Sequence, residues 1–144
     1  MGWTFYNSSG EQLIYDGGAA TEQATQAEAE AESNVDKYIP PDLIKNSPGV
    51  AKVWARWRQS DNVMGASYNM TSMVDGGAAG YSDLTFATDF SSGEYSITGS
   101  AEAASIFTME SGSAAAGTLT VRFMNVDGAY NDATHASVAI FGDQ

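Results

Sequence analysis

The chain has 144 residues, enough for one domain of ordinary size with a small extension. Its 43% hydrophobic and 17% charged residues are typical of a globular but lightly charged protein, and 15 glycines favour short strands joined by tight turns. The net charge of −12 disfavours nucleic-acid binding because such a field repels phosphates. Cysteine is absent, so disulfides and thiol chemistry are excluded.

Residues 1–18 are predicted to form a β-hairpin that leans on another protein. Asn7-Ser8-Ser9-Gly10 is a turn signal between two apolar stretches. A lone hairpin is barely stable in water, so its apolar side chains need a partner. The side chains expected to make this contact are Trp3, Phe5, Leu13 and Tyr15. No basic segment followed by an apolar run is present, so we expect neither a secretory signal nor membrane insertion.

Residues 19–48 are predicted to form a short Ala/Glu-rich helix and a proline-rich connector. Thr25 with Glu28 fits a capping box, and Asn34 is expected to close the helix. Four alanines at helical spacing would form a narrow stripe on one face: Ala20, Ala24, Ala27 and Ala31. This stripe buries little area, which leaves two interpretations. The segment is either a solvated acidic linker helix or a helix packed near a symmetry axis between copies of the chain.

Residues 49–144 are predicted to form an antiparallel β-sandwich of about seven or eight strands, so the chain as a whole is expected to be mainly β. In the first strand, Val50–Arg58, one face carries Val53, Ala55 and Trp57, and the other carries Trp54, Arg56 and Arg58. The remaining expected strands are Val63–Met73, Tyr81–Thr88, Glu94–Ser100, Ile106–Met109, Thr118–Val126 and Ala136–Gly142. Met64, Ala66, Tyr68 and Met70 are expected to share a face of the second strand.

The stretch from Ala24 to Leu43 resembles a phrase common in tail-fibre proteins of tailed bacteriophages, A-T-x-A-E-A-x-A-G-x-x-x-x-K-x-V-T-P-x-x-L. The matching positions are Ala24-Thr25, Ala27-Glu28-Ala29, Lys37 and Pro41, and Leu43 lies one residue before the place of the final leucine. Glu32 stands where the phrase has glycine, and Pro40 where it has threonine. Residues 49–144 are similar to the tip domains of such fibres. Their cues are Pro48-Gly49-Val50-Ala51-Lys52-Val53-Trp54, Ser67-Tyr68-Asn69, Phe90-Ser91-Ser92-Gly93-Glu94-Tyr95 and Ala136-Ser137-Val138-Ala139-Ile140-Phe141-Gly142.

The resemblance implies a homotrimeric structural protein on the virion surface, assembled in the bacterial cytoplasm and contributing to host attachment. We expect it not to be an enzyme, because the sequence has one histidine, no cysteine and no usable catalytic motif. A chain of 144 residues without stalk repeats fits a short fibre or a capsid decoration subunit better than a long tail fibre. The 1–18 hairpin would then dock on a capsid or tail protein. The expected subunit interface comprises the alanine stripe with Leu43 and Trp54.

Four side chains are candidates for contact with a host-surface glycan or another partner: Trp54, Arg56, Tyr81 and Tyr130. An aromatic ring beside a guanidinium suits sugars and acidic groups. The alternative for Trp54 is packing in a subunit interface.

Catalytic and cofactor chemistry find little support in the sequence. His135 is the lone histidine, and no nucleophile-elbow pattern accompanies it. We therefore expect no cofactor and no metal, although the Asp127–Asp132 loop is oxygen-rich. The alternative function is a fibre tip that cleaves glycans with a pair of carboxylates, for which the candidates are Asp83, Asp89 and Glu94.

Overall fold

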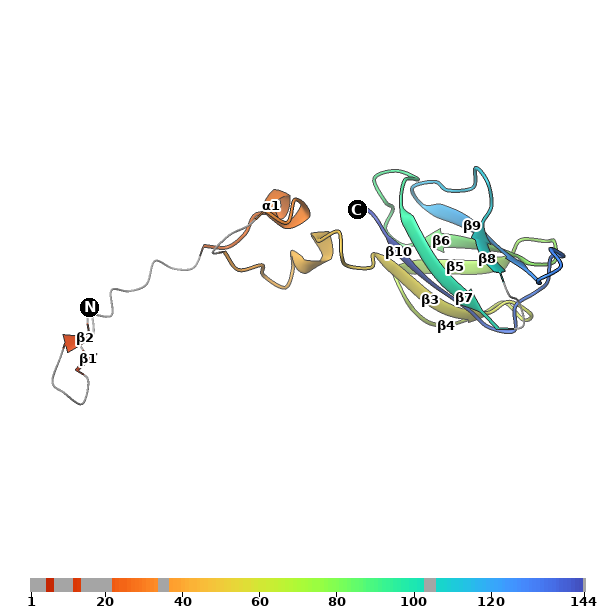
Figure 1. The fold of residues 1–144 in the computed structure, drawn as a ribbon, viewed down its shortest axis with the longest axis horizontal. Helices are drawn as coiled ribbons and strands as arrows, with labels where there is room; N and C mark the ends of the chain where they lie inside the picture. The colour runs from red at the N-terminus through yellow and green to blue at the C-terminus, as the bar shows by residue number, and fades with distance from the viewer. Residues whose placement is uncertain (1–4, 7–11, 14–21, 34–36, 103–105, 144) are drawn as a thin grey trace. The chain divides into compact units, whose positions relative to one another are not determined.

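The computed structural model describes residues 5–6, 12–13, 22–33, 37–102 and 106–143. The chain divides into two compact units, residues 1–47 and residues 48–144 (Figure 1). The sequence places the start of the sandwich at residue 49. Among the described residues, no helix has the length and apolar character needed to cross a membrane.

The second unit is a β-sandwich of two four-stranded antiparallel sheets, as the sequence predicts (Figure 1). The first sheet has the order β4-β3-β10-β7, with bounds Val63–Tyr68, Val53–Arg58, Ala136–Phe141 and Ser96–Ala101. The second has the order β5-β6-β9-β8, with bounds Met70–Asp75, Tyr81–Phe86, Thr118–Met124 and Ile106–Met109. We call them the β3 sheet and the β9 sheet.

The core lies between the two sheets, where alternating strands bury one face each. On β3 every second residue is buried, and β6, β9 and β10 show the same alternation. Trp57 is 1% exposed, and its indole Nε1–H donates to Ser82 Oγ of the opposite sheet at 3.3 Å. The rings of Trp57 and Phe123 lie 6.1 Å apart at a tilted angle. The alternation expected for Val53, Trp57 and the Thr118–Val126 strand is therefore confirmed.

The strand predicted over Val63–Met73 is wrong, because the chain there forms two strands in different sheets. The break falls at Asn69, which has a left-handed backbone with φ of 56°. Its side-chain Nδ2 donates to the carbonyls of Lys52 and Thr88, each at 3.1 Å, and its Oδ1 accepts from the Thr88 amide at 2.7 Å. Asparagine tolerates this conformation better than most residues and stabilises it with its own side chain.

The face assigned to this segment is also wrong. Tyr68 pairs with the outward Trp54, whereas Met64 pairs with the inward Trp57. A bulge between the two pairs shifts the alternation, so Met64 and Tyr68 point to opposite faces.

The described residues of the first unit form short elements. β1 (Phe5–Tyr6) and β2 (Gln12–Leu13) pair antiparallel, with Phe5 opposite Leu13. The outer hairpin residues Trp3 and Tyr15 lie outside the described residues. Helix α1 spans Gln26–Glu30 and the 3-10 helix η1 spans Ile44–Asn46.

Helix α1 is much shorter than the segment 19–36 from which it was predicted. It begins at the expected cap, since Thr25 Oγ1 accepts from the Glu28 amide and Glu28 Oε2 accepts from the Thr25 amide at 2.9 Å. It ends at Ala31 rather than at Asn34, because Glu32 turns left-handed with φ of 50°. The Ser33 amide donates to the Glu28 carbonyl at 3.1 Å and the Glu32 amide to Ala29 at 3.4 Å, which is a Schellman motif.

Candidate functional site

The outer face of the β3 sheet carries two aromatic rings beside a row of small polar residues. Trp54 is 43% exposed and Tyr68 is 50% exposed, and the two are register partners on adjacent strands. On the other side of Trp54, the row continues with Ala139 of β10 and Thr98 of β7. Aromatic faces next to hydroxyls are the combination that stacks against sugar rings and hydrogen-bonds their hydroxyls.

The next row of the same face brings together Arg56, Ser137 and Ser100, again as register partners. Small side chains on β7 and β10 leave a shallow trough of about 300 Å³. Its lining residues are Thr98, Gly99, Ser100, Ser137, Val138 and Ala139. This face therefore combines an aromatic end, an arginine and a floor of hydroxyl groups.

A β-bulge opens a second hollow beside Arg56. Ala55 pairs with Ser67 and Trp57 with Met64, so two residues of β4, Gly65 and Ala66, oppose Arg56 alone. A Cβ added at Gly65 would lie 2.9 Å from the Arg56 carbonyl oxygen, so glycine permits this close approach. The resulting bulge hollow has a volume of about 230 Å³. It is lined by Arg56, Trp57, Arg58, Val63, Gly65 and His135.

Both arginines of the bulge hollow are exposed and paired with the chain's own carboxylates. Arg56 Nη2 lies 3.0 Å from Glu102 Oε1, and Arg58 Nη2 lies 2.8 Å from Asp61 Oδ2. Glu102 Oε2 also contacts His135 Nδ1 at 2.9 Å, so one carboxylate joins the arginine to the histidine. The side chains of both ion pairs are about half exposed, and exposed pairs of this kind contribute little stability.

The two predicted tyrosines form a separate cluster on the outer face of the β9 sheet. Tyr81 and Tyr130 have ring centroids 5.2 Å apart, and the Arg122 guanidinium lies 6.0 Å and 5.8 Å from the two centroids. Arg122 also donates to the Tyr130 hydroxyl at 2.9 Å and pairs with Glu110 at 2.6 Å. Hydrogen bonding to Tyr81 and the nearby Glu110 carboxylate raise the pKa of Arg122 above its usual value. This guanidinium is enclosed by its own neighbours.

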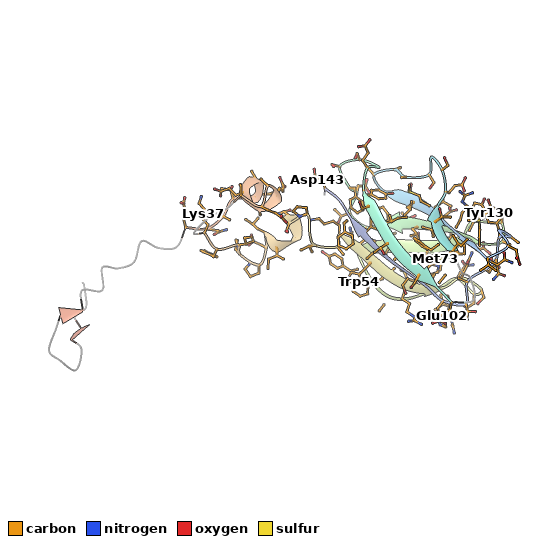
Figure 2. The ribbon with its side chains drawn as sticks, viewed as in Figure 1. Lys37, Trp54, Met73, Glu102, Tyr130 and Asp143 are labelled. Atoms are coloured by element: carbon orange, nitrogen blue, oxygen red, sulfur yellow. The ribbon has the colours of Figure 1, made fainter. Side chains whose placement is uncertain are left out.

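The four predicted contact residues are therefore not one site. Trp54 and Arg56 lie on the outer face of one sheet, and Tyr81 and Tyr130 on the outer face of the other. Figure 2 shows Trp54 and Tyr130 near opposite ends of the sandwich.

Sequence reasoning missed Tyr68 and His135 as neighbours of Trp54 and Arg56. The alternation of strand β3 predicts that Arg58 lies on the same face as Trp54 and Arg56, and the structure confirms it. The bulge in β4 and the return of the chain through β10 bring Tyr68 and His135 to this region. No local sequence pattern predicts either of these two positions.

The connector of the first unit is held together by Glu28 and Lys37. Lys37 Nζ lies 2.8 Å from Glu28 Oε1 and 3.5 Å from Glu22 Oε2. The hydrogen bond from Lys37 and those from Thr25 lower the pKa of Glu28 from 4.5 to about 2. The backbone closes the same loop, since the Ala24 amide donates to the Tyr38 carbonyl at 2.9 Å. Figure 2 marks Lys37 in this unit.

The expected alanine stripe does not lie on one face of the helix. Ala24 precedes the cap and is 2% exposed, and Ala31 is the C-terminal cap. Ala27 and Ala31 are exposed, while the alanine that α1 buries is Ala29, at 1% exposure. Ala20 lies outside the described residues. The helix therefore packs on its own unit through Ala29 and leaves Ala27 and Ala31 available.

Apolar side chains of the connector are exposed as well. Tyr38 is 50%, Ile39 is 37% and Ile44 is 48% exposed, while Leu43 is half-buried. Among the described residues 22–33 and 37–47, the buried residues are only Ala24, Ala29 and Pro40. The described residues of this unit thus include several exposed apolar side chains.

The candidate carboxylates for glycan cleavage are dispersed. Glu94 lines a hollow of about 480 Å³ with Tyr95, Ser96 and Phe141, and neither Asp83 nor Asp89 lines it. Asp83 instead accepts a hydrogen bond from Thr120 Oγ1 at 2.6 Å on the β9 sheet.

The oxygen-rich loop 127–132 is a turn in which Asn125 Oδ1 accepts from the amides of Asp127 and Ala129. Asp132 Oδ1 accepts from the Gly80 amide at 2.6 Å. Within the described part of the chain, no group of three or more His, Cys, Asp or Glu side chains is placed to hold a metal ion.

Comparison with models of known protein families, with curated proteins and with solved structures finds no match to this chain. Its function therefore has to be argued from its own residues.

Proposed function

We propose that this chain is a structural protein of a tailed-bacteriophage virion, a homotrimeric short fibre or capsid decoration subunit exposed on the particle surface. The observation that carries the proposal is the tail-fibre-like phrase from Ala24 to Leu43, which leads directly into a β-sandwich. The proposed role is structural and contributes to host attachment, without catalysis.

The contacts of the connector support this use of the phrase. Thr25 and Glu28 form the reciprocal cap, and Glu28 pairs with Lys37, so three matching positions determine the local structure. Glu32, which stands where the phrase has glycine, has the left-handed backbone that glycine adopts most easily. The phrase therefore fits the geometry even at a position where this chain departs from it.

Exposed apolar side chains in the connector support self-association. The part of this unit that the structure describes exposes Tyr38, Ile39 and Ile44, and it gains stability if copies of the chain cover these residues. The exposed Ala27 and Ala31 would allow close approach of backbones in such a contact. This corresponds to the interpretation of residues 19–48 as a helix packed near a symmetry axis between copies of the chain.

The outer face of the β3 sheet supports a role in attachment. Trp54, Tyr68 and the hydroxyl-lined trough form a surface suited to a sugar chain. Trp54 also remains a candidate for the subunit interface, and the two roles predict different effects of one substitution. Trp54→Ala lowers trimer stability in one case and glycan affinity in the other.

The oligomer is tested by light scattering of the purified full chain across micromolar concentrations. We expect a mass about three times the chain mass of 15.1 kDa. Ile44→Ser should shift the chain toward monomer, whereas the exposed sandwich substitution Val74→Ser should not. A monodisperse monomer of the wild-type chain would overturn the trimer.

The place on the particle is tested by immunogold labelling of phage particles whose genome encodes the chain. Labels on the capsid indicate a decoration subunit, and labels on the tail indicate a fibre. Particles without any label would contradict the virion role. Release of reducing sugars from host glycans by the purified chain would contradict a purely structural role.

A further inference from the structure

The bulge hollow concentrates the accessible positive charge of the sandwich. The chain has six Lys and Arg residues, four of them in residues 48–144. Of these, Lys52 is 3% exposed and the Arg122 side chain is 21% exposed. Arg56 and Arg58 are 56% and 47% exposed, and both line the bulge hollow together with His135. Within a protein of net charge −12, the sandwich thus gathers its exposed cations around one small depression.

From this geometry we propose that the bulge hollow binds the carboxylate of an acidic sugar unit. The chain's own carboxylates, Glu102 and Asp61, already sit on the two guanidinium groups, which shows that each is accessible to a carboxylate. Each ion pair is made through a terminal Nη2 nitrogen of its arginine, whereas a guanidinium carries five N–H donors. A ligand carboxylate can therefore join or replace these weak exposed pairs at little cost.

The surroundings of the hollow favour a sugar over a bare ion. Val63 gives it an apolar side chain, and Trp54 lies on the same face of β3 as Arg56. Ser137, the register partner of Arg56, supplies a hydroxyl in the adjacent trough. The volume of about 230 Å³ is below that of pockets for drug-sized ligands, so it suits one anionic group of a chain that continues along the sheet.

This inference rests on the proposed attachment role only for the choice of a sugar, and its test does not require an oligomer or a particle. The probe is methyl β-D-glucuronoside, compared with methyl β-D-glucoside and with acetate, titrated into the isotope-labelled full chain and followed by NMR. We expect glucuronoside to bind in the millimolar range and to shift the amides of Gly65, Ala66 and His135. The neutral glucoside should bind at least about tenfold more weakly, because it lacks the charge-assisted hydrogen bonds.

Arg56→Gln and Arg58→Gln should each weaken glucuronoside binding by about fivefold or more. Lys45→Gln removes the same charge at an exposed position of the first unit and should change the affinity by less than about twofold. Near-UV circular dichroism reports whether each variant keeps the wild-type fold.

Three results would overturn the proposal. Equal affinity for glucuronoside and glucoside would remove the role of the charge, and equal affinity for acetate would mean an adventitious ion only. Unchanged affinity in the double variant Arg56→Gln/Arg58→Gln would place the ligand elsewhere. If a variant misfolds, the chemical-shift perturbations of the wild-type chain provide the test. Perturbations confined to residues outside the bulge hollow would exclude the hollow as the binding site. A monomeric chain that still binds glucuronoside would refute the trimer and leave this site intact.

Discussion

The sandwich and the connector are stabilised by different physical means. The sandwich buries large side chains such as Trp57, Phe123 and Leu84 between two sheets, so the hydrophobic effect dominates its stability. In the described part of the connector, the buried residues are small, and a helix cap, an ion pair and backbone hydrogen bonds hold it together. The sandwich has a core of its own within one chain, and in the proposed trimer the connector would gain the most from contact with other copies.

The largest effect is expected from the core. Trp57→Ala should lower the free energy of unfolding of the sandwich by about 3–5 kcal/mol, because it leaves a cavity between the sheets and removes the bond to Ser82. Chemical denaturation followed by near-UV circular dichroism measures this loss. The control Trp54→Ala removes an indole that is 43% exposed and should cost less than about 1 kcal/mol in the monomer. Equal losses for both variants would contradict the assignment of core and surface.

A smaller effect is expected where the chain changes sheets. Asn69→Ala should cost about 2 kcal/mol, because it removes the bonds to Lys52 and Thr88 and leaves alanine in a left-handed conformation. Asn69→Gly loses the same bonds without the backbone strain, so it should cost about 1 kcal/mol less than alanine. Urea unfolding of the pair measures the difference. If the two variants have the same free energy of unfolding, the left-handed backbone at residue 69 does not contribute to the stability difference.

In the connector, Glu32→Gly should be stabilising. Glycine relieves the left-handed strain at the end of α1, and the expected gain is at most about 1 kcal/mol. Hydrogen exchange at the Ser33 amide, which closes the Schellman motif, should slow accordingly. Glu32→Ala removes the same carboxylate but keeps the strain, so its exchange rate should stay near the wild-type value. Faster exchange in the glycine variant would contradict this geometry.

The smallest effect on overall stability is expected from acid, and it should be local. The pKa of Glu28 is lowered from 4.5 to about 2 in the folded connector, so its contribution is fully present above about pH 4.5. It is lost as the pH falls through about 2. Carbon-13 NMR of the Glu28 carboxyl group measures this titration directly. Lys37→Gln removes the largest cause of the shift and should raise the pKa of Glu28 toward 4.5. An unchanged value in that variant would show that the Thr25 cap acts alone.

Local patterns predicted the sandwich well because its strands obey simple alternation. The buried face of β3 and that of β9 follow directly from the spacing of their apolar residues. The capping box at Thr25 and Glu28 is likewise a short-range pattern, and it forms where the sequence places it. The same reasoning failed at Asn69, since alternation continues through a residue whose left-handed backbone sends the chain to the other sheet.

The sequence by itself determined the mainly β fold, the exposed side of β3, the cap of α1 and the resemblance of residues 24–43 to a fibre phrase. These features depend on residues a few positions apart, and their physics is local. Only the tertiary structure decided which distant residues meet. It joined Arg56, Glu102 and His135 around a bulge, enclosed Arg122 between Tyr81 and Tyr130, and left the two arginines of the bulge hollow exposed. Strand order and register control those meetings, and both depend on the packing of the whole sandwich.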